Sequence, residues 1–173
     1  TGLKPLVKLA GQAVAAAVFY YIYYPKGFSI AGFQLPYAAA LVIFVLWCVA
    51  LINAFNLIDG LDGLCGGLVI VSLSMILAIA WSGGNWRDSA FIILMIGAVA
   101  GFLIYNFNPA RIFLGDAGSM MLGFFIASSA NDIAGERALI GSLMLPIAIA
   151  GVPLLDVILA IWRRSSRREL QKT

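Results

Sequence analysis

Polar side chains recur at intervals of three residues between two long apolar runs of the chain; they are Asn53, Asn56, Asp59 and Asp62. In a helical stretch one turn separates each member from the next, so all of them can share one face. Charges beside hydrocarbon are costly without partners, and a cation with a polar ligand would serve. Asp116, in the run Phe-Leu-Gly-Asp-Ala-Gly-Ser, supplies a further carboxylate for the same site.

The donor atoms available to such a site are hard oxygens. The chain contains no histidine, and its two cysteines, Cys48 and Cys65, lack metal-ligand spacing, so we interpret both as packing thiols. Without histidine, this chain cannot form a Ser-His-Asp triad, a Cys-His pair or an imidazole-bound zinc site. Carboxylate and amide oxygens suit Mg²⁺, with Mn²⁺ as the alternative, and an incoming diphosphate would complete the shell of the ion. The residue types therefore indicate metal-assisted phosphoryl transfer.

Glycines accompany both acidic segments, at positions 60, 63, 66 and 67 and at positions 115 and 118. Glycine permits positive φ and close backbone approach, and free amide groups at a helix N-terminus bind phosphate. Gly115 directly precedes Asp116 in this arrangement. Phe113, two residues earlier, is either an interfacial anchor or a stacking platform for a nucleobase.

The polar residues have structural interpretations that stay open beside the functional ones. Asp116 either caps the helix that follows it or holds the metal. Asp59 and Asp62 either form a solvated, capped turn or contact a ligand. Asn53 and Asn56 either hydrogen-bond between helices or help to build the site.

The elements that must position these residues are membrane-spanning helices. The chain has 173 residues, of which 62% are hydrophobic and 11% charged, and its mean hydropathy is +1.00. Soluble domains are roughly half apolar and about a quarter charged. The apolar runs are continuous and approach the ~20 residues that cross a bilayer as a helix. The sequence therefore predicts an all-α, polytopic transmembrane helical bundle.

Six spans are predicted, at residues 5–24, 36–52, 66–81, 89–105, 117–130 and 139–162. The last contains Pro146 and Pro153, which predict a kink. Turns are predicted at 82–85 and around Asn131 and Asp132. Gly97 and Gly101 form a small-xxx-small pair in the fourth span, which predicts helix packing.

The distribution of basic residues predicts the orientation of these spans. With six spans, both termini and the two acidic loops share one side of the membrane. Eight basic residues lie on that side (Lys4, Lys8, Arg111, Arg163, Arg164, Arg167, Arg168, Lys172) and three on the other (Lys26, Arg87, Arg137). Basic residues favour the cytoplasmic side, so both termini and the acidic residues are expected there. The basic tail is interpreted as an anchor at lipid head groups and not as a nucleic-acid surface.

Two long motifs resemble those of a known enzyme family. The segment 53–67, Asn-Ala-Phe-Asn-Leu-Ile-Asp-Gly-Leu-Asp-Gly-Leu-Cys-Gly-Gly, resembles the Asn-x-x-Asn-x-x-Asp-Gly-x-Asp-Gly-Leu motif of the polyprenyl-phosphate N-acetylhexosamine-1-phosphate transferases. The segment 106–119, Asn-Phe-Asn-Pro-Ala-Arg-Ile-Phe-Leu-Gly-Asp-Ala-Gly-Ser, resembles their second signature. The similarity extends over essentially the whole chain.

The resemblance implies an activity and a set of site residues. The family transfers a sugar 1-phosphate from a UDP-N-acetylhexosamine to polyprenyl phosphate, such as undecaprenyl phosphate, and releases UMP in the first membrane step of cell-envelope glycan synthesis. It requires Mg²⁺, which implies Asp116 as the metal ligand. The implied surroundings of the donor are Asp59 and Asp62 as catalytic groups at the nucleotide and diphosphate, Asn53, Asn56 and Gly115 in the substrate pocket, and Asn106 and Phe113 at the uracil ring.

The chain departs from the family pattern at its ends, since it carries neither the Asp-Asp pair expected before the first span nor the His-x-His loop expected after the sixth. We therefore expect residues 1–173 to be one integral-membrane transferase domain that is a central fragment of a bacterial plasma-membrane protein. The residues of the second signature slightly disfavour a muramoyl-pentapeptide donor, and the sequence does not specify the sugar. A homodimer is compatible with the sequence.

Two other functions compete with the transferase as explanations of this sequence. A transporter would need ionisable residues near mid-membrane, and only Asp156 is a candidate, at a depth of roughly 9 Å by helical rise. Asp156 is better explained as a structural polar group. A CDP-alcohol phosphotransferase is rejected, because its signature requires Ala-Arg where this chain has Gly63-Leu64.

Overall fold

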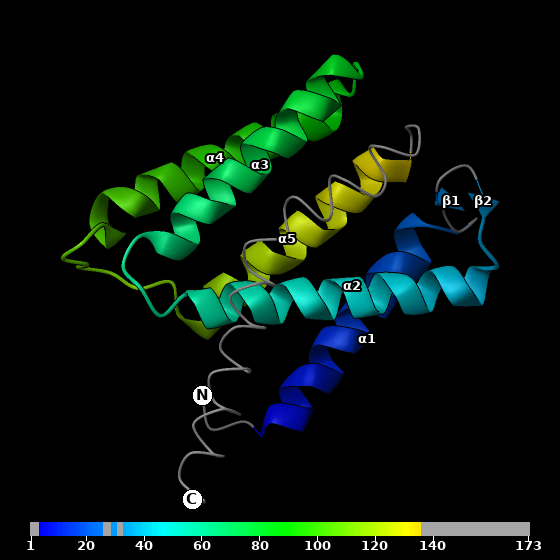
Figure 1. Cartoon of the computed structure of the whole chain (residues 1–173), viewed down its shortest axis with the longest axis horizontal. Helices are drawn as coiled ribbons and strands as arrows, with labels where there is room; N and C mark the ends of the chain where they lie inside the picture. Colours follow the sequence, from blue (N-terminus) through cyan, green and yellow to red (C-terminus); the bar gives the residue numbers. More distant parts are fainter. Residues whose placement is uncertain (1–3, 26–28, 31–32, 136–173) are drawn as a thin grey trace, which may run out of the picture.

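Five helices dominate the computed structural model, which describes residues 4–25, 29–30 and 33–135. They are α1 (Pro5–Tyr23), α2 (Tyr37–Ile58), α3 (Leu64–Ser82), α4 (Trp86–Asn106) and α5 (Gly115–Gly135). Two short strands, β1 (Ser29–Ile30) and β2 (Phe33–Gln34), pair antiparallel between α1 and α2 (Figure 1). The all-helical prediction is confirmed apart from this small ladder, which the sequence analysis did not predict.

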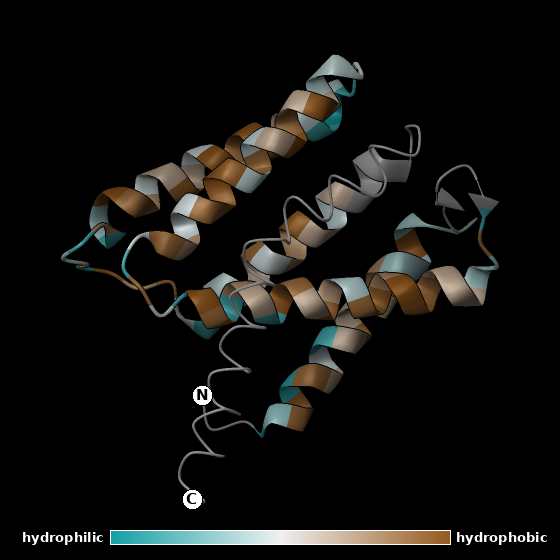
Figure 2. Cartoon of the chain, in the orientation of Figure 1, coloured by the Kyte–Doolittle hydropathy of each residue, from teal (hydrophilic) through white to brown (hydrophobic). Residues whose placement is uncertain are grey.

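Four of the described helices, α1 to α4, are long and apolar enough to cross a membrane. Figure 2 shows mainly hydrophobic residues along these helices and hydrophilic residues in the turns that join α3 to α4 and α4 to α5. The predicted spans at 5–24, 66–81 and 89–105 match α1, α3 and α4 within three residues. The sixth predicted span, with Pro146, Pro153 and Asp156, and the basic tail lie outside the described residues, so the count of six and the orientation stay predictions.

Two helices extend further than predicted. Helix α2 continues beyond Ile52 through Asn53 and Asn56, because both amides find hydrogen-bond partners on neighbouring helices and no glycine intervenes before residue 60. Helix α5 begins at Gly115 and continues past Ala130 to Gly135, so the turn predicted around 131–132 is helical. The first of these differences matters for the site, because it places both asparagines on a helix.

The turn between α3 and α4 forms where its composition predicted it. Gly84 has φ 75°, and the backbone N–H groups of Gly84 and Asn85 donate to the carbonyls of Trp81 and Ala80, which is a Schellman ending. Asn85 then caps α4, since its side-chain oxygen accepts from the Asp88 backbone N–H at 3.3 Å and its amide donates to the Asp88 carboxylate at 2.6 Å. These contacts make α3 and α4 an antiparallel pair, which is visible in Figure 1.

Helix α5 packs directly on the backbone of α2 at Gly123. A Cβ at this position would lie 2.8 Å from the Ile52 Cα and 2.9 Å from the Leu51 carbonyl oxygen. One turn further along α5, the Trp47 indole N–H donates to the Ala127 carbonyl at 3.1 Å. This close approach aligns the C-terminal half of α2 with the start of α5, where the acidic residues lie.

The two glycines predicted to pack helices do not do so among the described residues. Gly97 and Gly101 are exposed on α4, and a Cβ at either would meet no atom of the described residues within 4 Å. Helix packing at this pair therefore stays a prediction, because small-xxx-small spacing gives a close contact only where a partner helix faces it. Gly66 supports the α3–α4 pair instead, since a Cβ there would lie 2.8 Å from the Leu103 Cδ2.

Replacing Gly123 by alanine should destabilise the protein by about 1–3 kcal/mol, because the added methyl meets backbone atoms that cannot rotate away. Thermal unfolding of the detergent-purified protein measures the loss. Gly97→Ala is the matched control, since it adds the same methyl where no atom of the described residues lies within 4 Å and favours helix formation. Equal melting temperatures for the two variants would contradict the close α2–α5 contact.

Candidate active site

The four polar residues at intervals of three, from Asn53 to Asp62, form a polar row that does not lie on a single helix. Asn53 and Asn56 lie on α2, Asp59 is its C-terminal cap, and Asp62 belongs to the turn that leads to α3. Gly63 closes the turn with φ 75°. The row therefore does not share one helical face throughout, because the chain reverses direction after Asp59.

Asp116 lies in the first turn of α5, one residue inside the helix and not before it. Gly115 begins the helix with φ 66°, a conformation that glycine adopts without strain. A carboxylate in the first turn interacts favourably with the positive end of the helix dipole. The structure thus supports a helix-terminal role for Asp116, and this role leaves the carboxylate oxygens facing α1 and α2.

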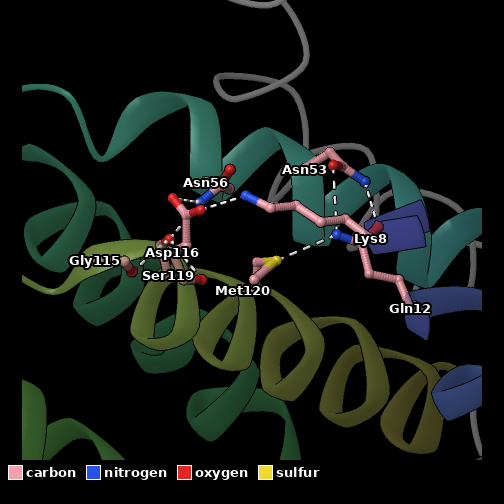
Figure 3. Close-up of polar contacts among 8 residues, drawn as sticks. All are labelled: Lys8, Gln12, Asn53, Asn56, Gly115, Asp116, Ser119 and Met120. Atoms are coloured by element: carbon pink, nitrogen blue, oxygen red, sulfur yellow. Dashed lines mark hydrogen bonds and ion pairs between the residues drawn. The ribbon is translucent and has the colours of Figure 1, made fainter. Parts of the chain in front are cut away.

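Asn56 joins α2 to the beginning of α5 (Figure 3). Its amide nitrogen donates to the Ser119 hydroxyl at 2.9 Å and approaches the Asp116 Oδ1 at 3.4 Å. The Ser119 hydroxyl donates in turn to the Gly115 carbonyl at 3.0 Å. Asn56 is therefore an interhelical hydrogen-bonding residue that also contacts the predicted metal ligand.

Lys8 of α1 forms an ion pair with the Oδ2 of Asp116. The Lys8 side chain is 27% exposed and that of Asp116 is 42% exposed, so solvent screens the pair only in part. In the sequence, Lys8 is recognisable only as a basic residue that contributes to orientation. No spacing rule could have found this contact, because the partners are far apart in the chain.

Asp59 completes a pair of carboxylates with Asp116. Partial burial and the nearby Asp116 carboxylate raise the pKa of Asp59 above its ordinary value, whereas a hydrogen bond from the Gly115 backbone N–H acts in the opposite direction. Two carboxylates that repel one another form a site that a cation would stabilise. The described residues contain no cluster of three or more acidic, histidine or cysteine side chains. The pair still fits Mg²⁺, which commonly takes one or two carboxylates and fills its shell with water and phosphate oxygens.

Asp62 does not join this pair. Its Oδ2 accepts hydrogen bonds from the Asn108 side-chain amide at 3.2 Å and the Ala110 backbone N–H at 3.1 Å. Both donors belong to the loop between α4 and α5, which contains a cis peptide bond before Pro109. Asp62 therefore connects the two signature segments to one another.

Asn106 makes a second connection between the same segments. It is 5% exposed, its Oδ1 accepts from the Gly63 backbone N–H at 3.0 Å, and its Nδ2 donates to the Ile112 carbonyl at 2.8 Å. Both ends of the amide are thus engaged inside the protein. This geometry favours a role in shaping the loop, and contact of Asn106 with a uracil ring stays a prediction.

Asn53 and Phe113 differ in their availability to a ligand, because Asn53 is hydrogen-bonded within the protein and Phe113 is exposed. Asn53 donates to the Gln12 amide oxygen at 2.7 Å and to the Val49 carbonyl at 2.7 Å, which confirms the interhelical interpretation. Phe113 is 74% exposed, so its ring has a free face. Gln12 and Ser119 also take part in the network, although neither is among the predicted site residues. The available signal in the sequence was a polar side chain within a predicted apolar span.

Comparison with known proteins matches residues 1–134 to the model of glycosyl transferase family 4. A Bacillus subtilis (strain 168) protein named as a probable undecaprenyl-phosphate N-acetylglucosaminyl 1-phosphate transferase is 45% identical over 69% of this chain and 34% of its own length. The decaprenyl-phosphate N-acetylglucosaminephosphotransferase of Mycobacterium tuberculosis (strain ATCC 25618 / H37Rv) is 33% identical over 95% of this chain and 47% of its own length.

A phospho-N-acetylmuramoyl-pentapeptide-transferase of Limosilactobacillus fermentum is 38% identical over 99% of this chain and 54% of its own length. The chain therefore spans about a third to a half of the length of the relatives it matches. The names of these relatives give two different sugar groups, N-acetylglucosamine and N-acetylmuramoyl-pentapeptide. Similarity therefore identifies the family and not the sugar donor. The family model covers most of the sequence, and the chain belongs to glycosyl transferase family 4.

Proposed function

We propose that this chain forms the core of a membrane enzyme that transfers N-acetylhexosamine 1-phosphate from a UDP-sugar to polyprenyl phosphate. An oxygen of the lipid phosphate would bond to the sugar-bearing phosphorus, the bond from that phosphorus to the bridging oxygen would break, and UMP would leave with that oxygen. The observation that carries the proposal is the meeting of Asp59 and Asp116 beside Lys8, at one end of the helices. The names of the relatives support the lipid acceptor.

Asp116, together with Asp59, would hold Mg²⁺, with Mn²⁺ as an alternative. When bound, the ion supplies positive charge that stabilises the transferring phosphoryl group. Lys8 provides a second positive charge next to Asp116 and so reduces the repulsion that a diphosphate would meet from the carboxylates.

The donor nucleotide would lie along the two connected signature segments. Phe113 offers an exposed ring for stacking on uracil, and the start of α5 at Gly115 offers a helix N-terminus for phosphate. Asp62 and Asn106 would hold these groups in register through their loop hydrogen bonds. We place this site at the cytoplasmic face of the bacterial plasma membrane, because the basic residues favour that side.

The transporter alternative is not favoured. In the described membrane helices α1 to α4, the acidic and basic residues are Lys8, Arg87 and Asp88, and each lies in the first turn or just after it. A transport pathway would be expected to place ionisable residues near mid-membrane. The charges of the described helices are instead at their ends, as a membrane-surface enzyme requires.

The direct test supplies membranes that contain the full-length protein with radiolabelled UDP-N-acetylglucosamine, polyprenyl phosphate and Mg²⁺. We expect label in the lipid fraction, release of UMP, loss of both with EDTA, and recovery when Mg²⁺ is added back. Label from another UDP-N-acetylhexosamine, including the muramoyl pentapeptide form, would identify a different donor. If no donor labels the lipid although the protein is folded, the transferase proposal is wrong.

Asp116→Asn should reduce transfer by about 10²-fold or more, because it removes a charge that acts directly on the metal and phosphoryl group. Membrane insertion should be unchanged. Asp88→Asn is the charge-matched control at the opposite end of the helix pair and should retain most of the activity. Wild-type turnover by the Asp116 variant would remove Asp116 from the metal site.

Asp59→Asn should lower transfer and at the same time raise the melting temperature in EDTA at neutral pH, by about 1–3 °C. The fold raises the pKa of Asp59, so ionisation of this carboxyl costs stability as the pH rises through that pKa. The variant lacks this cost at neutral pH, and its advantage should disappear as the pH falls below the ordinary pKa of an aspartate. A melting temperature below wild type at neutral pH would contradict the carboxylate repulsion.

A further inference from the structure

The buried face of α1 is a stripe of residues four positions apart. Gln12, Ala16 and Tyr20 are its buried members, and Lys8 continues the stripe one turn toward the N-terminus. Residues at this spacing lie above one another on a helix. The rotation of α1 that buries Gln12 therefore also directs Lys8 toward the bundle.

Gln12 is the buried residue of α1 that lies nearest to the N-terminus of the helix, and so to Lys8 and the site. The residues between it and the start of the helix include Leu6, Val7 and Leu9, which are 79%, 53% and 39% exposed. Within the described residues, the first turns of α1 are thus attached to the other helices mainly through polar contacts. Those contacts are made by Gln12 and Lys8.

The contacts of Gln12 are specific for a primary amide. It accepts from the Asn53 Nδ2 at 2.7 Å, and its own Nε2 lies 3.5 Å from the Asn53 Oδ1 and 3.3 Å from the Met120 Sδ. Asn53 belongs to α2 and Met120 to α5, so one side chain ties α1 to both helices that carry the site (Figure 3). A part-buried amide pair of this kind favours one rotation and one height of the helix, because other placements leave polar atoms without these partners.

We propose that Gln12 is a positioning residue for the transfer reaction, and that it acts by holding α1 where the Lys8 ammonium reaches the Asp116 carboxylate. This inference rests on the proposed function only for its kinetic consequence. The positional statement concerns the fold alone. Loss of the Gln12 amide should free the first turns of α1, and the Lys8–Asp116 pair should then open more often.

The first test measures the reactivity of the Lys8 amine with an acylating reagent by mass spectrometry on the purified full-length protein. Lys4, at the exposed beginning of the same helix, is the internal standard. Gln12→Met keeps the length of the side chain and removes its amide. We expect it to increase labelling of Lys8 relative to Lys4 about two- to fivefold, the range expected for loss of a part-exposed ion pair.

Val14→Met is the matched control, because it places the same side chain on the 62% exposed Val14 position of the same helix. It should label like wild type. Should Gln12→Met fail to accumulate, Gln12→Asn keeps the polarity but loses one methylene of reach, and the same increase is expected. Unchanged Lys8 labelling in a folded Gln12 variant would overturn the proposal, whether or not the protein transfers a sugar phosphate.

The second test is a double-mutant cycle on transfer activity. Gln12→Met should lower kcat about tenfold, and adding it to Lys8→Met should cause no further loss, because its effect passes through Lys8. Independent, multiplying effects would mean that Gln12 acts by general stability and would overturn the positioning role. If wild type shows no transfer, the proposed function fails and the labelling result alone decides the role of Gln12.

Discussion

The approach of α5 to α2 at Gly123 is the constraint on which the site depends. Backbone meets backbone there, so the two helices have little freedom to slide or separate. The same alignment brings Asn56 of α2 against Ser119 at the beginning of α5. Asp59 and Asp116 are remote in the chain. They become neighbours because Asp59 caps the C-terminus of α2 and Asp116 lies in the first turn of α5.

The balance of charge around these carboxylates explains why the site is both costly and useful. Asp116 has Lys8 as a partner, whereas Asp59 has a backbone amide and an unfavourable neighbour. The repulsion lowers the stability of the fold, and a bound cation would relieve it. Such a compromise between stability and function is common at active sites. The amide side chains of Gln12, Asn53 and Asn56 are suited to this environment because they hold the helices without adding charge.

The sequence predicted the described helices well, because apolar runs and glycine-bounded turns have strong local signals. It could not separate the roles within the polar row. Asn53 and Asp62 share a three-residue spacing with Asn56 and Asp59, yet Asn53 bonds to α1 and Asp62 to the α4–α5 loop. Such roles depend on which distant segment lies opposite, and the contacts of Gln12 and Lys8 depend on distant partners in the same way. Gly97 and Gly101 show the converse, a local pattern without a partner among the described residues.

The double link between the turn at 59–63 and the loop at 107–114 has an evolutionary consequence. Asp62 and Asn106 each join one segment to the other, so the shape of each segment depends in part on the other. Recombination between relatives with a crossover inside α3 or α4 would pair segments that had not been selected together. The two segments are therefore expected to be inherited as one unit, although the whole α3–α4 hairpin lies between them.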